Sequence, residues 1–150
     1  MLTLRFDFRL KPDSPTSMEN LYETALQMCE WGERNGAITA MFSEHHSSPD
    51  GYLPSPLILA AAAASRTETL TFNVGALLLL MYDPIKLAED IAVLDHLSRG
   101  RVGYTIGLGY RAEEYAMFGV DTIRRGKDLE ERILILRRAL SGESFEWQGR

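Results

Sequence analysis

The chain has 150 residues, 45% of them hydrophobic, and a formal net charge of −5 at pH 7. This length and hydrophobic share predict one domain, residues 1–150, with its own core. The acidic balance argues against nucleic acid or an anionic membrane surface as the main partner. No uncharged apolar run reaches the ~18 residues of a membrane span, and no secretory signal is evident. The cytoplasm is therefore the expected location.

The first predicted unit is a strand followed by a helix. Apolar and polar side chains alternate over residues 2–10, which is the period of a half-buried strand. Thr16 with Glu19 three residues later forms a capping-box pattern, so a helix is expected to begin at Thr16 and to end at Gly36. A second strand is expected over residues 38–44.

The next two helices each open with a polar residue followed by proline. Ser55 and Pro56 begin a helix expected to end near residue 67, and residues 83–84 begin another that is capped by Gly100. Between them, residues 70–80 are apolar on both faces. Such a strand is typical of a parallel sheet that is covered on both sides.

The C-terminal part contains a fourth strand, over residues 102–110, and two helices, over residues 113–118 and about 127–140. Gly142 ends the last helix, and Phe145 and Trp147 alternate as in another extended segment. The chain therefore contains four βα units. Such units build either an open doubly wound sheet or part of a (β/α)8 barrel, and the pattern alone does not choose between them.

A cluster of polar residues, Glu44, His45 and His46, closes the second predicted strand. In a parallel sheet that edge gathers the active-site loops. Alternation puts His45 on the opposite side of the strand from Glu44 and His46, so that one histidine can face the barrel mouth. A histidine there can act as a general acid or base. These three residues are the candidate catalytic set, and a hydrogen-bonded loop histidine is the alternative. We expect no metal site, because adjacent histidines do not easily share an ion.

The fourth predicted strand has one face almost without side chains. Gly107 and Gly109 lie there, and a planar ring could approach their backbone. Relief of crowding inside a barrel explains the glycines equally well. Together with Ala112 they also match a dinucleotide-binding fingerprint, but that motif belongs after the first strand of a Rossmann domain. Elsewhere, Asp95 is predicted to be buried and to pair with Arg101 in a structural role.

Several motifs occur in the order and spacing seen in luciferase-like monooxygenases, which this sequence resembles. They are residues 44–46 (EHH), 52–56 (YLPSP), 61–67 (AAAASRT), 73–75 (NVG), 83–84 (DP), 94–95 (LD) and 98–101 (SRGR). The resemblance runs from the first strand to Arg150. It implies an α/β fold that forms the N-terminal half of a (β/α)8 TIM-type barrel.

The resemblance also implies roles for individual residues. His45 matches the histidine near the reactive edge of the flavin. Residues 75–78, namely Gly75, Ala76, Leu77 and Leu78, match a bulge of the third strand beneath the flavin ring, where a non-proline cis peptide is often found. Leu77–Leu78 is the expected position of that peptide. Gly107, Gly109 and Arg111 complete the implied cofactor-binding set. Bacterial luciferases have a basic residue where this chain has Leu108, so the phosphate contact is either lost or moved to Arg111.

The implied activity is reaction of reduced FMN with O2 and oxygenation of a small organic substrate. Hydride transfer with F420 is one alternative, and a non-catalytic or truncated half-barrel is the other. Half of a closed sheet exposes two unpaired edges. We therefore expect a homodimer or higher homo-oligomer that forms through these edges.

Overall fold

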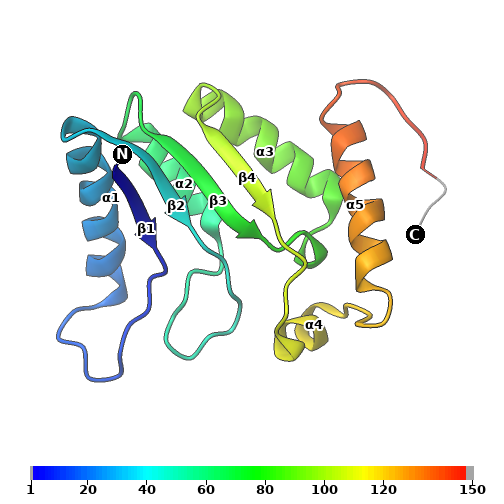
Figure 1. Cartoon of the computed structure of the whole chain (residues 1–150), viewed down its shortest axis with the longest axis horizontal. Helices are drawn as coiled ribbons and strands as arrows, with labels where there is room; N and C mark the ends of the chain where they lie inside the picture. Colours follow the sequence, from blue (N-terminus) through cyan, green and yellow to red (C-terminus); the bar gives the residue numbers. More distant parts are fainter. Residues whose placement is uncertain (1, 148–150) are drawn as a thin grey trace.

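The computed structural model describes residues 2–147, in which strands and helices alternate along the chain (Figure 1). The elements are β1 (Leu2–Phe6), α1 (Met18–Arg34), β2 (Ala37–Phe42), α2 (Pro56–Ser65), β3 (Thr71–Leu77), the 3-10 helix η1 (Leu79–Met81), α3 (Pro84–Ser98), β4 (Val102–Ile106), α4 (Ala112–Phe118) and α5 (Arg125–Ala139). None of the helices in this part of the chain is long and apolar enough to cross a membrane.

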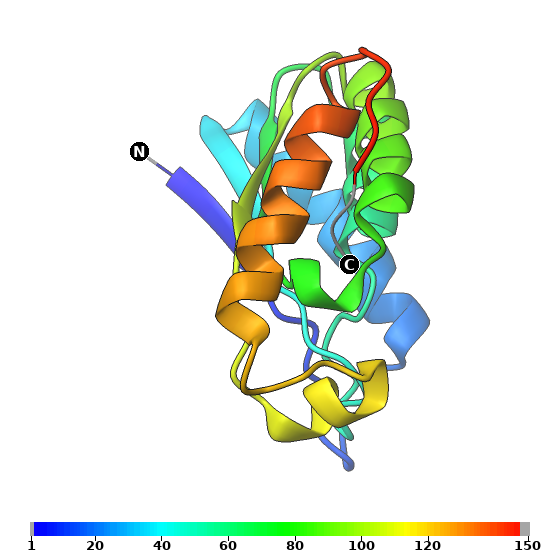
Figure 2. The ribbon, with the colours of Figure 1, turned by 90° about the vertical axis from the view of Figure 1, so that its right-hand side faces the viewer.

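The four strands form one parallel sheet in the order β1-β2-β3-β4, so each strand lies beside its neighbour in sequence. Helix α1 packs on β2, α2 on β3 and α3 on β4, while α5 packs on α3. Figures 1 and 2 show these helices on one side of the sheet. A doubly wound sheet reverses its strand order and carries helices on both faces. The observed arrangement is instead that of successive units of a barrel, which confirms the four predicted βα units.

The strands end earlier than the sequence pattern predicted. β1 was expected to reach residue 10 but ends at Phe6, because Phe8 adopts a positive φ of 59° that breaks the pleat. The Phe8 ring nevertheless stays buried, 5.2 Å from the ring of Tyr22. β3 and β4 likewise end at Leu77 and Ile106. The residues beyond these ends form the loops at the carboxyl edge of the sheet.

One predicted helix cap was wrong, and another, Ser55 before Pro56, is at the predicted position but without a side-chain hydrogen bond. Ser17, and not Thr16, is the N-cap of α1, since its hydroxyl accepts a hydrogen bond from the backbone N–H of Asn20 at 3.3 Å. Ser55 makes no capping hydrogen bond at the start of α2. Asp83 does cap α3 as predicted, through the backbone N–H groups of residues 85 and 86. Residues 145–147 are not part of a strand.

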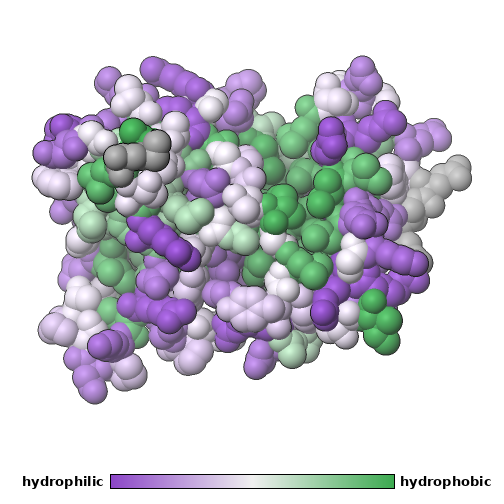
Figure 3. All heavy atoms as spheres, viewed as in Figure 1, coloured by the Kyte–Doolittle hydropathy of each residue, from purple (hydrophilic) through white to green (hydrophobic). Residues whose placement is uncertain are grey.

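One face of the sheet is covered by helices, and the other is open. Phe42, Phe72 and Leu77 are fully buried on the face that the helices cover. On the other face Arg5 lies beside Met41 in the parallel register and is exposed. Figure 3 views this open face and shows hydrophobic residues gathered on it between β4 and α5.

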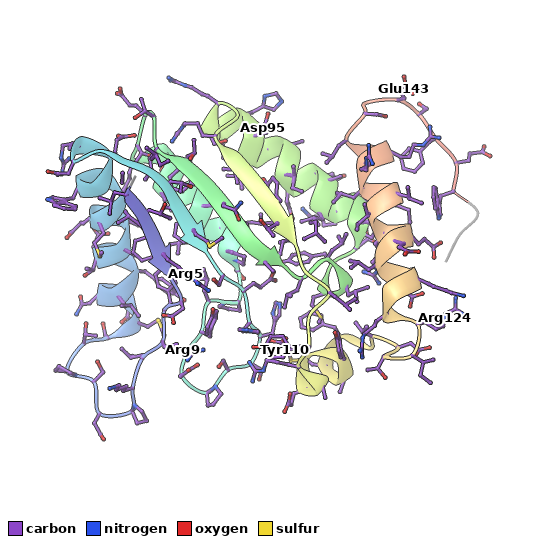
Figure 4. The ribbon with its side chains drawn as sticks, in the orientation of Figure 1. Arg5, Arg9, Asp95, Tyr110, Arg124 and Glu143 are labelled. Atoms are coloured by element: carbon purple, nitrogen blue, oxygen red, sulfur yellow. The ribbon has the colours of Figure 1, made fainter. Side chains whose placement is uncertain are left out.

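At the amino edge of the sheet, Arg101 joins α2, α3 and β3. Its guanidinium donates to the backbone carbonyls of Ala64, Thr67, Leu70 and Ser98, at 2.7–3.0 Å. The predicted buried pair of Asp95 with Arg101 is wrong. Asp95 is exposed on α3 (Figure 4), and the preference of Arg101 for helix-terminal carbonyls explains why it needs no carboxylate partner.

Candidate functional site

A cavity of about 480 Å³ lies at the carboxyl edge of the sheet, among the segments that follow β1, β2, β3 and β4. Figure 4 shows Arg5, Arg9 and Tyr110 on this side of the molecule. The volume of the cavity lies within the range of roughly 300–1,000 Å³ that is common for small-molecule sites. The lining residues are Arg5, Arg9, Ser43, Glu44, His45, Tyr52, Gly75, Ala76, Leu78, Leu108, Gly109 and Tyr110.

His45 stands on the wall of this cavity with both ring nitrogens engaged. Its Nδ1 lies 2.9 Å from Oε1 of Glu114, and its Nε2 lies 3.3 Å from the hydroxyl of Tyr110. The edge of the ring meets Tyr52, with the ring centroids 4.7 Å apart. The side chain keeps 15% of its surface exposed. These contacts hold the imidazole in one orientation on the cavity wall.

Glu44 turns its carboxylate into the protein. Oε1 accepts hydrogen bonds from Tyr82 at 2.5 Å and from Nε2 of His46 at 2.9 Å, and Oε2 accepts one from the backbone N–H of Leu78 at 2.8 Å. Burial of the Tyr82 hydroxyl, together with the neighbouring Glu44 charge, raises the pKa of Tyr82 well above its usual range. Tyr82 therefore remains a donor, and Glu44 ties the segment after β2 to the segment after β3.

Glu114 is a site residue that the sequence did not single out. It lies on α4, which Figure 1 places beyond the carboxyl ends of the strands, and it is 1% exposed. Besides His45, its Oε1 accepts the backbone N–H of His46 at 2.8 Å and lies 3.6 Å from Nη1 of Arg111. Oε2 has no hydrogen-bond partner within residues 2–147. The neighbouring glutamate on α4, Glu113, is exposed. Only the face of the helix separates the two glutamates, and no local sequence pattern marks that face.

The bulge expected in the third strand is present, but its cis peptide is not where it was predicted. The cis bond joins Gly75 and Ala76, whereas the predicted position is Leu77–Leu78. The register between β3 and β4 shifts between Gly75 and Leu77, which is the signature of a bulge. The cis peptide lies two residues earlier than expected, and the backbone of residues 75–76 lines the cavity.

The glycines after β4 serve close packing and turn geometry. A Cβ at Gly107 would lie 2.6 Å from the Cβ of Ala76, so a side chain does not fit there. Gly109 has a positive φ of 87°. Gly109 lines the cavity, while Gly107, Leu77 and Arg111 do not. Relief of crowding is thus the explanation that the geometry favours for Gly107.

Residues 5–150 match the model of the luciferase-like monooxygenase family. The chain belongs to this family. Among its relatives, limonene 1,2-monooxygenase of Rhodococcus erythropolis is 34% identical over 119 residues, which make up 79% of this chain and 31% of that protein. The oxygenase component of the flavin-dependent trigonelline monooxygenase of Acinetobacter baylyi is 27% identical over 135 residues, or 89% of this chain and 37% of that one.

Solved structures of luciferase-like monooxygenases have the same fold. The oxygenating constituent of 3,6-diketocamphane monooxygenase from Pseudomonas putida, a type II Baeyer-Villiger monooxygenase in complex with FMN, aligns with a TM-score of 0.89 and 27% identity. The match covers 99% of this chain and 41% of that one. The chain therefore spans less than half the length of these relatives, and the prediction of the N-terminal half of a TIM-type barrel is confirmed.

The geometry of this luciferase-like site suits a flat, partly polar ligand. Part of the lining is backbone without bulky side chains, at Gly75, Ala76 and Gly109, and the His45 imidazole lines the same cavity. Arg5 and Arg9 add positive charge, and the Arg9 guanidinium lies 5.1 Å from the Tyr52 ring centroid. A planar ring system with anionic or carbonyl oxygens fits this donor set. The residues present thus fit a flavin.

Proposed function

We propose that this chain forms the histidine-bearing part of a flavin-dependent monooxygenase site, which uses reduced FMN and O2 to oxygenate a small organic substrate. Membership of the luciferase-like family supports the general activity. The observation that carries the proposal is one cavity that is lined both by His45 and by the side-chain-poor backbone of Gly75 and Ala76.

The lining residues would have separate roles in binding the flavin and in moving a proton. Gly75, Ala76 and Gly109 would allow the isoalloxazine ring to lie close to the backbone, and the arginines would meet its polar atoms. Reduced FMN would supply the electrons that activate O2. His45 would hold or move a proton at Nε2, since Nδ1 is already bound to Glu114. Glu44 would act through Leu78, as a positioning residue for the wall.

Titration of the protein with FMN and with F420, followed by fluorescence, tests the cofactor. Saturable binding of FMN in preference to F420 is the expected result. If only F420 binds, the proposed activity is hydride transfer and not oxygenation. If neither cofactor binds at high concentration, the chain is a non-catalytic half-barrel.

Oxygenation assays with reduced FMN, using a panel of small cyclic hydrocarbons and ketones that begins with limonene, test the role of His45. His45→Ala should lower kcat by about 100-fold, as is typical for loss of a general acid or base. The Kd for FMN should change far less. His96→Ala, which alters an exposed histidine on α3, is the matched control. Equal effects of the two substitutions would remove His45 from the proposal.

We also propose that the protein associates through the edges of its sheet. Within residues 2–147, β1 pairs only with β2, and β4 pairs only with β3. Unpaired edges expose backbone N–H and C=O groups, which favours strand pairing with another chain. Light scattering should give at least the mass of a dimer, and a stable monomer at micromolar concentration would contradict the proposal.

A further inference from the structure

The hydrogen bonds around His45 fix which of its nitrogens carries the hydrogen. Oε1 of Glu114 accepts the backbone N–H of His46 at 2.8 Å. The same oxygen lies 2.9 Å from Nδ1 of His45, so it is the acceptor there as well and Nδ1 is the donor. In the neutral ring Nε2 then has a lone pair, which faces the Tyr110 hydroxyl at 3.3 Å.

The neighbouring histidine is held in the opposite way. Nε2 of His46 lies 2.9 Å from Oε1 of Glu44, an oxygen that already accepts the hydroxyl of Tyr82 at 2.5 Å. His46 must therefore donate through Nε2. Two adjacent residues thus take opposite tautomers, each selected by a carboxylate that is buried in the protein.

Tyr110 connects His45 to the cavity. Its side chain is 77% exposed and lines the cavity, and its ring meets His45 edge-on, with the centroids 5.5 Å apart. Since Nε2 of His45 is an acceptor, the phenol donates its hydrogen to it. The other lone pair of the phenol oxygen remains available to a ligand.

We propose that Glu114, His45 and Tyr110 form a proton relay that serves a small molecule with an ionisable O–H or N–H group. The ligand gives its proton to the phenol oxygen of Tyr110 while Tyr110 passes its own hydroxyl proton to Nε2 of His45. The resulting imidazolium faces Glu114, and the return step reverses both transfers. Glu114 is a positioning residue, and Tyr110 is the residue that touches the ligand. The use of the relay in oxygenation rests on the proposed function. The assignment of the tautomers rests on the hydrogen bonds alone.

Long-range ¹H–¹⁵N NMR spectra of the protein without cofactor test the geometry. The spectra are recorded near pH 8.5, about two units above the ordinary histidine pKa of about 6.5. The chain has three histidines, so single His→Gln variants assign every signal. We expect a protonated Nδ1 on His45 and a protonated Nε2 on His46. A protonated Nε2 on His45 would overturn the relay.

Variants separate the contributions of the two partners of His45. Glu114→Ala should move the hydrogen of His45 to Nε2, while Glu114→Gln, whose amide oxygen still accepts, should keep it on Nδ1. Glu113→Ala changes the exposed neighbour on α4 and should alter nothing. Tyr110→Phe should leave the tautomer intact but shift the Nε2 resonance. This last substitution is at an exposed site and keeps the test valid if Glu114→Ala does not fold. An unmoved Nε2 resonance would exclude Tyr110 from the relay.

Turnover measurements then separate the relay from the proposed function. Tyr110→Phe should lower kcat by about 100-fold and leave FMN binding unchanged. If FMN binds and kcat does not fall, the relay is wrong and the monooxygenase proposal stands. If the protein fails to bind FMN, the monooxygenase proposal is wrong, and the NMR result still decides the relay.

Discussion

Replacement of Arg101 by methionine tests how the amino edge of the sheet is held together. The guanidinium donates to four backbone carbonyl oxygens, which belong to the end of α2, the start of β3 and the end of α3. Methionine keeps much of the aliphatic stem but has no donor. The carbonyls of Ala64, Thr67, Leu70 and Ser98 then lose their partner together.

The magnitude follows from the exposure of the site. Loss of a partner costs about 1–3 kcal/mol for each buried acceptor. Arg101 is half-buried, so water can replace part of the interaction and the lower value applies. Four acceptors at about 1 kcal/mol each give a loss of about 4 kcal/mol in the free energy of unfolding. For a chain of this size that corresponds to a fall in Tm of about 8–16 °C.

Urea unfolding followed by circular dichroism measures this loss. Arg101→Lys should recover little of it, because an ammonium group cannot span the four acceptors as a planar fork does. Arg137→Met, which changes an exposed arginine on α5, is the control and should alter stability by no more than about 0.5 kcal/mol. A loss below about 1 kcal/mol for Arg101→Met would refute the reasoning.

Two further predictions concern close packing and pH. Gly107→Ala should destabilise the protein by about 1–3 kcal/mol, because the new Cβ would overpack against Ala76. Gly103→Ala is the control and should cause no such loss, because its Cβ would come no closer than 3.8 Å to the backbone oxygen of Phe72. Equal urea midpoints for the two variants would contradict the crowding explanation. The pKa of Glu33 lies at about 2, because burial, which raises it, is outweighed by hydrogen bonds from the backbone of residues 68–70 and the Thr69 hydroxyl. The stabilising effect of the Glu33 carboxylate should therefore be complete above pH 4.5 and should fade as the pH falls toward 2. The free energies of unfolding of wild type and Glu33→Gln should then converge in acid. A full difference between them that persists at pH 2 would argue against the lowered pKa of Glu33.

The sequence predicted the order of the elements well because each unit carries its own start signal. Alternating side chains marked the first strand, an apolar run marked the third, and Asp83 with its following proline marked α3. The ends of the strands were less predictable. Phe8 reads as another apolar strand position, and only the packing of its ring against α1 and β2 shows why the backbone turns there.

The site was predictable only in part. His45 could be found, because it follows a strand at the edge where parallel sheets gather their loops. Glu114 could not, since its partner lies 69 residues away in sequence and nothing local distinguishes it from Glu113. Arg101 was assigned the wrong partner for a similar reason. Backbone carbonyl groups at helix ends cannot be recognised from residue types as partners of an arginine. A nearby acidic residue such as Asp95 can, and it was therefore chosen.

The buried carboxylates of Glu44 and Glu114 have a consequence for protein engineering. Glu44 follows β2 and binds the segment after β3, while Glu114 follows β4 and binds the segment after β2. Grafting only the segment after β2 or only the segment after β3 from a relative would take partners away from a buried carboxylate that stays behind, and grafting only the segment after β4 would remove the carboxylate that holds His45. Recombination of substrate specificity in this scaffold should therefore exchange all three segments as a block.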